Sequence, residues 1–325
     1  MEPRRFGRSD LSVSPIGVGC SRLGGMFANG SSRHQELALI GHALDNGINL
    51  FDTADMYSHG QSEVLVGKAV KSRRAEVVLA TKGGYLRPAQ SLLGRVKPIL
   101  APVVRALKVK RPGGAAAGAG ASIDQDFSPR HLVEALEASL RRLKTDYVDI
   151  YQLHSPPRSV VDAGEFVEVL EGLKRQGKIR YYGVAVDAAD VAGGLDRHPT
   201  VASLQLPFSA IDQEAASSVL AQAATLGIGV IARSCFAAGL LVGDSSPEQL
   251  RERTPDADRI LAFQAAADRL GRPRKELALH FALDTPAIAV TLVGMREPAQ
   301  VDEIVRLATA PPLTSDEMAT LLSLA

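Results

Sequence analysis

Short apolar runs rich in β-branched residues alternate along the chain with longer stretches in which apolar residues recur at helical spacing. The short runs are four to eight residues long and are bounded by Gly, Asp or Asn, as is typical of buried strands. We predict eight strands: Ile16–Gly19, Asn49–Thr53, Val77–Thr81, Tyr147–Leu153, Ile179–Val186, Ala202–Leu206, Gly229–Ala232 and Ala289–Val293. We predict helices at Ser32–Asn46, Ser62–Ser72, Ser128–Leu143, Ala163–Gln176, Ala188–Asp196, Gln213–Leu226, Asp256–Leu270, Arg274–Leu283, Pro298–Ala308 and Ser315–Leu322.

This alternation of eight strands with helices predicts an α/β protein with a closed (β/α)8 fold, the TIM barrel. An open doubly wound sheet is the alternative, but the run Gly17-Val18-Gly19 has no third glycine at the offset that a dinucleotide-binding turn requires. Before the first strand, Arg4–Phe6 and Leu11–Val13 flank a short turn and are predicted to form an N-terminal hairpin that plugs one end of the barrel. We therefore expect a single barrel domain over residues 1–325.

Residues 84–123 interrupt the pattern after the third barrel strand. Between Gly84 and Ile123 there are seven Lys or Arg residues and no Asp or Glu, and the segment ends in the Gly/Ala run Gly113–Ala121. We predict a basic, Gly/Ala-rich loop insertion, which in a barrel would lie on the catalytic face and could cover a site there. The alternative is a basic amphipathic stretch that contacts a membrane surface or an anionic partner, although Pro98 and Pro102 would interrupt a long helix.

The composition describes an ordinary globular protein, with 46% hydrophobic and 22% charged residues and a net charge of +1. This charge balance gives no reason to expect nucleic acid as a partner. The only two cysteines, Cys20 and Cys235, have no metal-type spacing, which favours a reducing compartment. The first 15 residues contain no apolar signal-peptide region, and no apolar run has transmembrane length. We expect a cytoplasmic enzyme without membrane contact and infer no obligate protein partner.

Titratable side chains follow three successive predicted strands. Asp52 and Tyr57 follow the second strand, Lys82 the third and His154 the fourth. Each has an ordinary structural explanation when taken alone, such as a helix cap or a solvated lysine. Because the carboxyl ends of barrel strands build the catalytic face, we expect these four residues to meet at one mouth, and their joint arrival favours catalysis. No His/Cys cluster is present, so we expect no metal.

Two long motifs around these residues resemble those of the aldo-keto reductase superfamily. They are NLFDTADMYSHGQSEVLVGKAV and DFSPRHLVEALEASLRRLKTDYVDIYQLHSPP, and the resemblance extends over nearly the whole chain except the insertion. It implies an NADP-dependent oxidoreductase that transfers hydride between NADP(H) and a carbonyl or alcohol substrate. Tyr57 would then be the general acid and base, and Lys82, held charged by Asp52, would lower the pKa of the phenol from its free value of about 10. His154 would orient the carbonyl oxygen and stabilise charge that develops on it.

The resemblance also implies cofactor contacts, and this chain departs from some of them. Gln205 matches the glutamine that binds the nicotinamide carboxamide, whereas Ala185 and Val186 replace a Ser-Asn pair. Arg233 stands where an aromatic ring often stacks on the nicotinamide, and its planar guanidinium can stack in the same way.

The phosphate and adenine contacts carry over in part, because Ile304 stands where an asparagine usually contacts the adenine. Arg296 would pair with the 2′-phosphate, which favours NADPH over NADH. The remaining matched positions, for pyrophosphate, phosphate or adenine, are Arg22, Ser234, Phe236, Gln300 and Glu303.

Two other functions stay open. The barrel could bind NADPH as a regulatory or redox-sensing protein with little turnover, or Lys82 could form a Schiff base in an aldolase-like reaction. The substrate class expected for a reductase is an aldehyde, a ketone or a sugar-like compound. The absence of tryptophan removes indole walls from the pocket and favours a polar, sugar-like or anionic carbonyl substrate.

Overall fold

The computed structural model describes residues 1–25, 32–86 and 124–324. Within them the chain forms two compact units: Met1–Gly84 together with Phe127–Ala325, and Tyr85–Asp126. The assignment of residues 1–325 to one barrel domain therefore stays a proposal.

In the smaller unit, Tyr85 and Gln125 form an isolated antiparallel bridge, and the Leu86 amide donates to the Asp124 carbonyl at 2.7 Å. Most of the basic insertion predicted at residues 84–123 lies outside the described residues.

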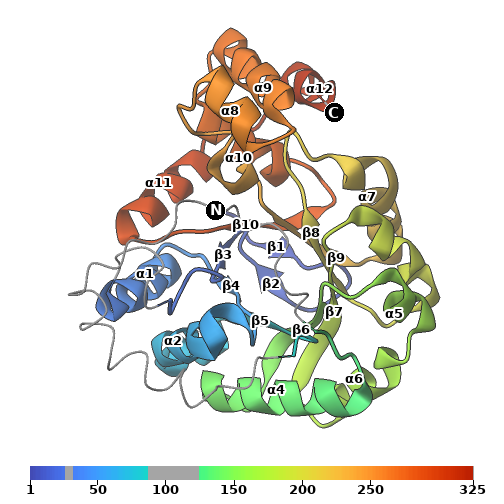
Figure 1. Ribbon diagram of the computed structural model, residues 1–325. Coiled ribbons are helices and arrows are strands. Elements are labelled where there is room, and N and C mark those ends of the chain that lie inside the picture. The colour runs from blue at the N-terminus through green and yellow to red at the C-terminus, as the bar shows by residue number, and fades with distance from the viewer. Residues whose placement is uncertain (26–31, 87–123, 325) are drawn as a thin grey trace, which may run out of the picture. The chain divides into compact units, whose positions relative to one another are not determined.

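Eight parallel strands of the larger unit close into a barrel, which confirms the predicted fold class (Figure 1). Each strand pairs with the next along the chain, and the last pairs with the first, Thr291 facing Ile16. The strands are β3 (Ile16–Gly19), β4 (Leu50–Asp52), β5 (Val78–Gly83), β6 (Val148–His154), β7 (Ile179–Ala185), β8 (Ser203–Pro207), β9 (Gly229–Arg233) and β10 (Ile288–Val293).

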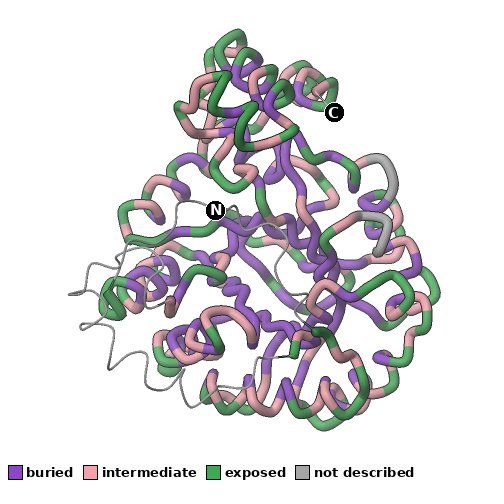
Figure 2. Tube along the Cα trace, in the orientation of Figure 1, coloured by how far each residue is buried: buried purple, intermediate pink, exposed green. Residues whose placement is uncertain are grey.

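Helices surround the barrel, with buried residues toward the strands and exposed residues on the outside (Figures 1 and 2). The α-helices are α1 (Arg33–Asp45), α2 (Gln61–Val70), α4 (Pro129–Leu143), α5 (Arg158–Ala163), α6 (Phe166–Arg175), α7 (Glu214–Leu226), α8 (Pro247–Arg253), α9 (Ala257–Leu270), α10 (Arg274–Leu283), α11 (Pro298–Ala308) and α12 (Ser315–Leu322). Four 3-10 segments complete the set: η1 (Tyr57–Gly60), η2 (Lys71–Glu76), η3 (Ala189–Arg197) and η4 (Ala237–Gly239).

Three helix predictions need correction. The helix predicted at Ala163–Gln176 is α6, and the preceding helix α5, which ends at Gly164 with φ 68°, was not predicted. The segment predicted as a helix at Ala188–Asp196 is the 3-10 segment η3. Sequence periodicity missed α8, which begins at a capping box formed by Ser246 and Gln249.

The N-terminal hairpin closes the end of the barrel where the strands begin. β1 (Arg4–Arg5) pairs antiparallel with β2 (Ser12–Val13), and Phe6, Leu11 and Val13 pack with inward residues of the strands in one buried cluster. Gly229 is required beneath this plug, because a Cβ there would come within 2.5 Å of the Phe6 ring.

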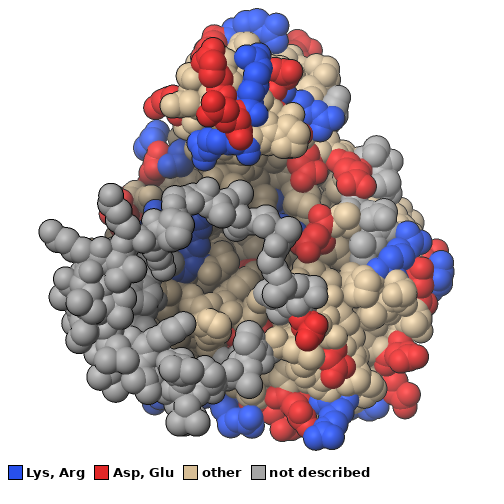
Figure 3. All heavy atoms as spheres, viewed as in Figure 1, with Lys and Arg blue, Asp and Glu red and all other residues tan. Residues whose placement is uncertain are grey.

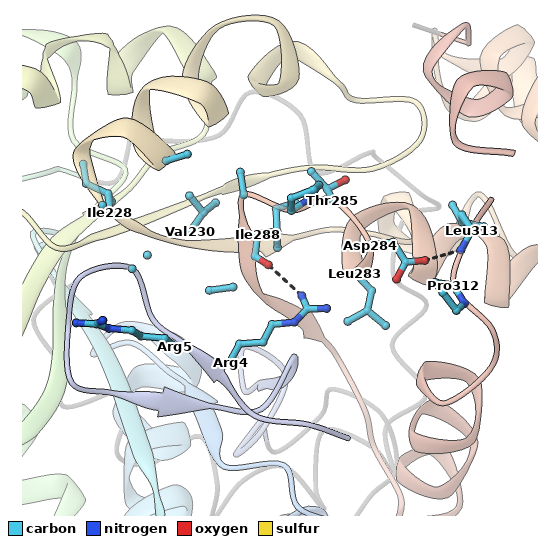
Figure 4. Close-up of a pocket in the computed structure, with 17 residues that line it drawn as sticks. Arg4, Arg5, Ile228, Val230, Leu283, Asp284, Thr285, Ile288, Pro312 and Leu313 are labelled. Carbon is cyan, nitrogen blue, oxygen red and sulfur yellow. Dashed lines mark hydrogen bonds between the residues drawn. The ribbon is translucent and has the colours of Figure 1, made fainter. Parts of the chain in front are cut away.

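A cavity of about 790 Å³ lies beside the hairpin at this end (Figure 4). Arg4 reaches across it and donates from Nη1 to the Ile288 carbonyl at 3.0 Å, while Asp284 accepts from the Leu313 amide at 2.8 Å. The first contact ties the hairpin to β10, and the second ties the end of α10 to the segment before α12.

On the face seen in Figure 3, Lys and Arg side chains are interspersed with Asp and Glu. In the described part of the chain, no helix combines the length and the apolar character needed to cross a bilayer.

Candidate functional site

A cleft of about 290 Å³ opens where the barrel strands end. Its wall is mostly small or polar: Gly19, Ser21, Asp52, Tyr57, His154, Ser155, Ala185, Asp187, Gln205, Arg233, Ser234, Leu292 and Gly294. Three of the four predicted catalytic side chains lie on this wall, and the fourth, Lys82, is buried behind it.

Neighbouring strands bring the four side chains together, as the sequence predicted. Asp52 and His154 are the last residues of β4 and β6, and Lys82 is next to last in β5. Tyr57 begins η1, the turn that follows β4. The rings of Tyr57 and His154 meet at nearly a right angle, with an interplanar angle of 84° and the centroids 5.6 Å apart.

Lys82 is the centre of a buried hydrogen-bonded group and is 1% exposed. Its Nζ donates to Asp52 Oδ2 at 2.6 Å, to the Thr53 carbonyl at 3.0 Å and to the Tyr57 hydroxyl at 3.3 Å. Burial disfavours the charged amine, but the charges of Asp52 and Tyr57 and their hydrogen bonds outweigh burial and raise the pKa of Lys82. The amine therefore stays an ammonium at neutral pH.

The pKa of Tyr57 is raised, not lowered as the sequence suggested. Burial of the phenol is the largest cause; the charge and hydrogen bond of Lys82 lower the pKa, and the charge of Asp52 raises it. The expectation of a net lowering was wrong because burial outweighs the lysine. The phenol keeps its proton throughout the neutral range.

The backbone after Tyr57 is strained. Ser58 and His59 have φ values of 48° and 55°, and Gly60 follows at 81°. Left-handed conformations at non-glycine residues cost about 1–3 kcal/mol each and persist where the surrounding structure imposes them, often at functional sites. The Tyr57 amide donates to the Ala54 carbonyl at 3.2 Å, so the ring leaves a tight turn directly at the end of β4.

His154 is a neutral imidazole at physiological pH. Burial is the largest cause that lowers its pKa well below the ordinary value, and the charges of Lys82 and Arg233 act in the same direction. The chain then turns sharply at Ser155, which has φ 51° and donates its amide hydrogen to the Ala185 carbonyl at 2.7 Å.

Gln205 is placed in the same buried group, where its side chain binds Asp52. Its Nε2 donates to Asp52 Oδ1 at 2.9 Å and lies 3.5 Å from Gln152 Oε1, and Gln152 Nε2 donates to Ser203 Oγ at 2.8 Å. The amide nitrogen of Gln205 is thus directed at the carboxylate. Gln152 and Ser203 were not predicted as site residues, because their only signal in the sequence is a polar residue inside an otherwise apolar strand.

Arg233 joins the ends of two strands on the cleft wall. It ends β9, and its Nη2 donates to Asp187 Oδ1 at 2.5 Å and to the Val186 carbonyl at 3.1 Å, both just beyond β7. Sequence reasoning missed Asp187. Ser234, with φ 66°, also lines the cleft.

The other predicted cofactor residues do not line this cleft. Arg22 is exposed beside Ser21, and Phe236 packs partly buried against the core. Gln300 accepts from the Arg296 amide at 2.7 Å, and Glu303 forms an ion pair with Lys275. The Arg296 side chain is exposed, and within the described residues no carboxylate pairs with it.

Among the described residues, no group of three or more His, Cys, Asp or Glu side chains is placed to hold a metal ion. Cys20 and Cys235 are both buried, and burial is the largest cause that raises the pKa of each thiol, to about 12 for Cys235. Neither is a reactive thiolate.

The chain is similar to known proteins over almost its whole length. An uncharacterized oxidoreductase, YqkF, of Bacillus subtilis (strain 168) is 30% identical over 336 residues, covering 99% of this chain and 96% of that protein. L-galactose dehydrogenase of Arabidopsis thaliana is 29% identical over 318 residues, covering 95% and 88%. The structure of aldo-keto reductase AKR11C1 from Bacillus halodurans (holo form) matches with a TM-score of 0.82 at 30% identity, covering 100% of this chain and 96% of that one.

The family model described as the Aldo/keto reductase family matches residues 15–325, a range that contains every strand of the barrel and the cleft at their carboxyl ends. Fold, motifs and relatives agree, and the chain belongs to the aldo/keto reductase family, which implies an oxidoreductase that reduces carbonyl groups with a nicotinamide cofactor.

Proposed function

We propose that the protein reduces the carbonyl group of a small substrate with hydride from NADPH, and that Tyr57 donates the proton. The position of the Tyr57 side chain carries this proposal. Tyr57 lines the cleft, while its hydroxyl lies 3.3 Å from the buried Lys82 ammonium. A proton donor must reach the substrate and leave behind a stabilised anion, and this arrangement meets both requirements.

The proton passes from Tyr57 to the carbonyl oxygen as negative charge develops on that oxygen. The raised pKa keeps the proton on Tyr57 until the substrate is bound. The phenolate that remains faces Lys82, whose own charge is maintained by Asp52 at 2.6 Å. In the reverse direction the same phenolate would accept the proton of an alcohol.

His154 acts as a hydrogen-bond donor in this proposal, not as a second acid. Its lowered pKa leaves a neutral ring, which has one N–H to offer and no proton to lose at neutral pH. It would orient the carbonyl oxygen toward Tyr57 and stabilise the developing charge.

The described residues fit a nicotinamide dinucleotide phosphate. Gln205 lines the cleft and would bind the carboxamide of the nicotinamide. Gly19 and Gly294 also line the cleft and have no side chains that would fill it. Arg296 presents an exposed guanidinium without a carboxylate partner among the described residues, next to α11, whose start no side chain caps. A cation beside the positive end of a helix dipole is suited to a phosphate, which favours NADPH over NADH. NADPH supplies the hydride when it is bound.

We propose a polar, sugar-like aldehyde or ketone as the substrate. Ser155, Asp187 and Arg233 line the cleft close to His154 and offer hydrogen bonds to hydroxyl or anionic groups. The relative named L-galactose dehydrogenase supports this class.

The two other functions make different predictions. A Schiff base needs a neutral amine, but Asp52 and Tyr57 raise the pKa of Lys82 and oppose this. A regulatory barrel would bind NADPH without turnover. The experiment measures oxidation of NADPH and of NADH with a panel of aldoses and simple aldehydes, alongside borohydride trapping. Steady NADPH oxidation supports the proposal; trapped Lys82 adducts, or binding without turnover across the panel, would overturn it.

A further inference from the structure

Arg233 and Asp187 form an ion pair on the cleft wall, and both residues line the cleft. The Arg233 side chain is 31% exposed and the Asp187 side chain 68% exposed. The two hydrogens on Nη2 of Arg233 lie in the guanidinium plane, and their acceptors, Asp187 Oδ1 and the Val186 carbonyl, hold that plane in place. The carboxylate, by contrast, is largely in water, where its field is screened.

The charge of Arg233 reaches the reacting groups. It lowers the pKa of His154, and it opposes the rise in the pKa of Tyr57. The other cation at the site, Lys82, has a buried carboxylate at 2.6 Å. Arg233 is therefore the positive charge on the cleft wall whose counter-ion is mostly solvated.

Any ring that delivers hydride to a carbonyl held by Tyr57 must enter this cleft of about 290 Å³, of which Arg233 forms part of the wall. The reduced nicotinamide ring is uncharged, whereas the oxidised ring carries one positive charge. An aromatic side chain at this position would attract a cation through its π face. A guanidinium repels one.

We infer that Arg233, oriented by Asp187, makes the cleft select the reduced cofactor over the oxidised one. This inference rests on the proposed function. At equal concentrations of the two forms, more of the protein carries the reduced cofactor, and the oxidised product leaves more readily, which favours turnover in carbonyl reduction. For unit charges about 6 Å apart at an effective dielectric constant of about 40 to 80, Coulomb's law gives a preference of about 3- to 10-fold.

The test compares dissociation constants for NADPH and NADP+ in the full chain, NADPH by its own fluorescence and NADP+ by competition. We expect Arg233→Gln to bind NADP+ more tightly relative to NADPH. The ratio of the Kd for NADP+ to the Kd for NADPH should therefore fall by about 3- to 10-fold. Arg233→Lys keeps the charge and should keep the ratio near that of the wild type. An unchanged ratio in Arg233→Gln, or an equal fall in Arg233→Lys, would overturn the inference.

Arg296→Gln is the matched control, because the 2′-phosphate is the same in both redox forms. This variant should weaken NADPH and NADP+ alike and leave their ratio unchanged. If the wild type binds neither form, the proposed function itself fails. If it binds both and Arg233→Gln leaves the ratio unaltered, the redox selection alone is wrong.

Discussion

Replacement of Lys82 by methionine tests the buried ion pair on which the proposed acid depends. The change removes the ammonium and leaves the Asp52 carboxylate, which is 3% exposed, with the Gln205 amide at 2.9 Å as its remaining side-chain donor. Removing one member of a buried pair costs about 3–5 kcal/mol, because the other charge stays buried without compensation. We expect Lys82→Met to lower the free energy of unfolding by that amount.

The double variant Asp52→Asn/Lys82→Met separates stability from activity. With both charges removed, most of the lost unfolding free energy should return, because neutral replacements of buried pairs are often tolerated. Reductase activity should not return, since the Tyr57 phenolate would still lack its cation; we expect kcat/KM to fall by about 10²- to 10⁴-fold in both variants.

The assays are urea denaturation followed by circular dichroism and NADPH-dependent reduction of a substrate found in the panel. Lys178→Met is the matched control, because Lys178 and Glu137 form a 2.8 Å ion pair whose side chains are 30% and 42% exposed. It should cost no more than about 1 kcal/mol. A Lys82→Met protein as stable as this control, or a double variant less stable than the single one, would refute the reasoning.

Three further predictions concern pH, the C-terminal helices and the cofactor. Because the pKa of Tyr57 is raised, kcat/KM for reduction should stay level through neutral pH and fall only above about pH 10. Because the pKa of His154 is lowered, its titration should not appear between about pH 6.5 and 8. A break in the profile in that interval would contradict the role of His154 as a neutral hydrogen-bond donor. His280 faces two acceptors, Asp284 Oδ2 and the Leu307 carbonyl, both at 2.9 Å. Burial and Arg272 oppose the charged form of His280, but Asp284 and the Leu307 carbonyl outweigh them and raise its pKa. The stabilisation by the charged His280 is present in full below its unfolded pKa of about 6.5 and is lost as pH rises through the higher folded pKa. In urea denaturation, His280→Gln should therefore lower the free energy of unfolding more at about pH 6 than at about pH 9. An equal loss at both pH values would count against this. Arg296→Gln should raise the Kd for NADPH by about 10- to 100-fold, because one charge-assisted hydrogen bond is lost, and should leave the Kd for NADH unchanged. A parallel change in both Kd values would show that Arg296 does not bind the 2′-phosphate.

Much of the fold was predictable because its signals are local. Parallel strands buried on both faces appear as continuous apolar runs, and β3 was predicted with the bounds Ile16–Gly19 that the structure has. The helices α10, α11 and α12 also have their predicted bounds. The helix α5 and the 3-10 form of η3 were missed, since α5 has only six residues, too few for a helical pattern to show, and η3 contains two glycines that weaken such a pattern.

The site was predictable to the same extent. Asp52, Tyr57, Lys82 and His154 could be grouped because each lies at or just after the end of a strand, and strand ends of a barrel meet. The bridge from Arg233 to Asp187 could not, because it joins residues 46 positions apart whose pairing depends on side-chain geometry. The direction of the Tyr57 pKa shift could not be predicted either, because it is a balance between burial of the phenol and the charge of Lys82 that is set by the folded structure.

The most direct test of the central claim is a comparison of Tyr57→Phe with the wild type. The change removes one hydroxyl oxygen that faces Lys82 and leaves the rest of the cleft in place. NADPH-dependent turnover should fall by about 10²- to 10⁴-fold while the Kd for NADPH stays near the wild-type value. Tyr147→Phe should change neither, because Tyr147 directly precedes β6, at the opposite end of that strand from the cleft residue His154. Normal turnover by Tyr57→Phe would contradict the account, because another group would then have to supply the proton.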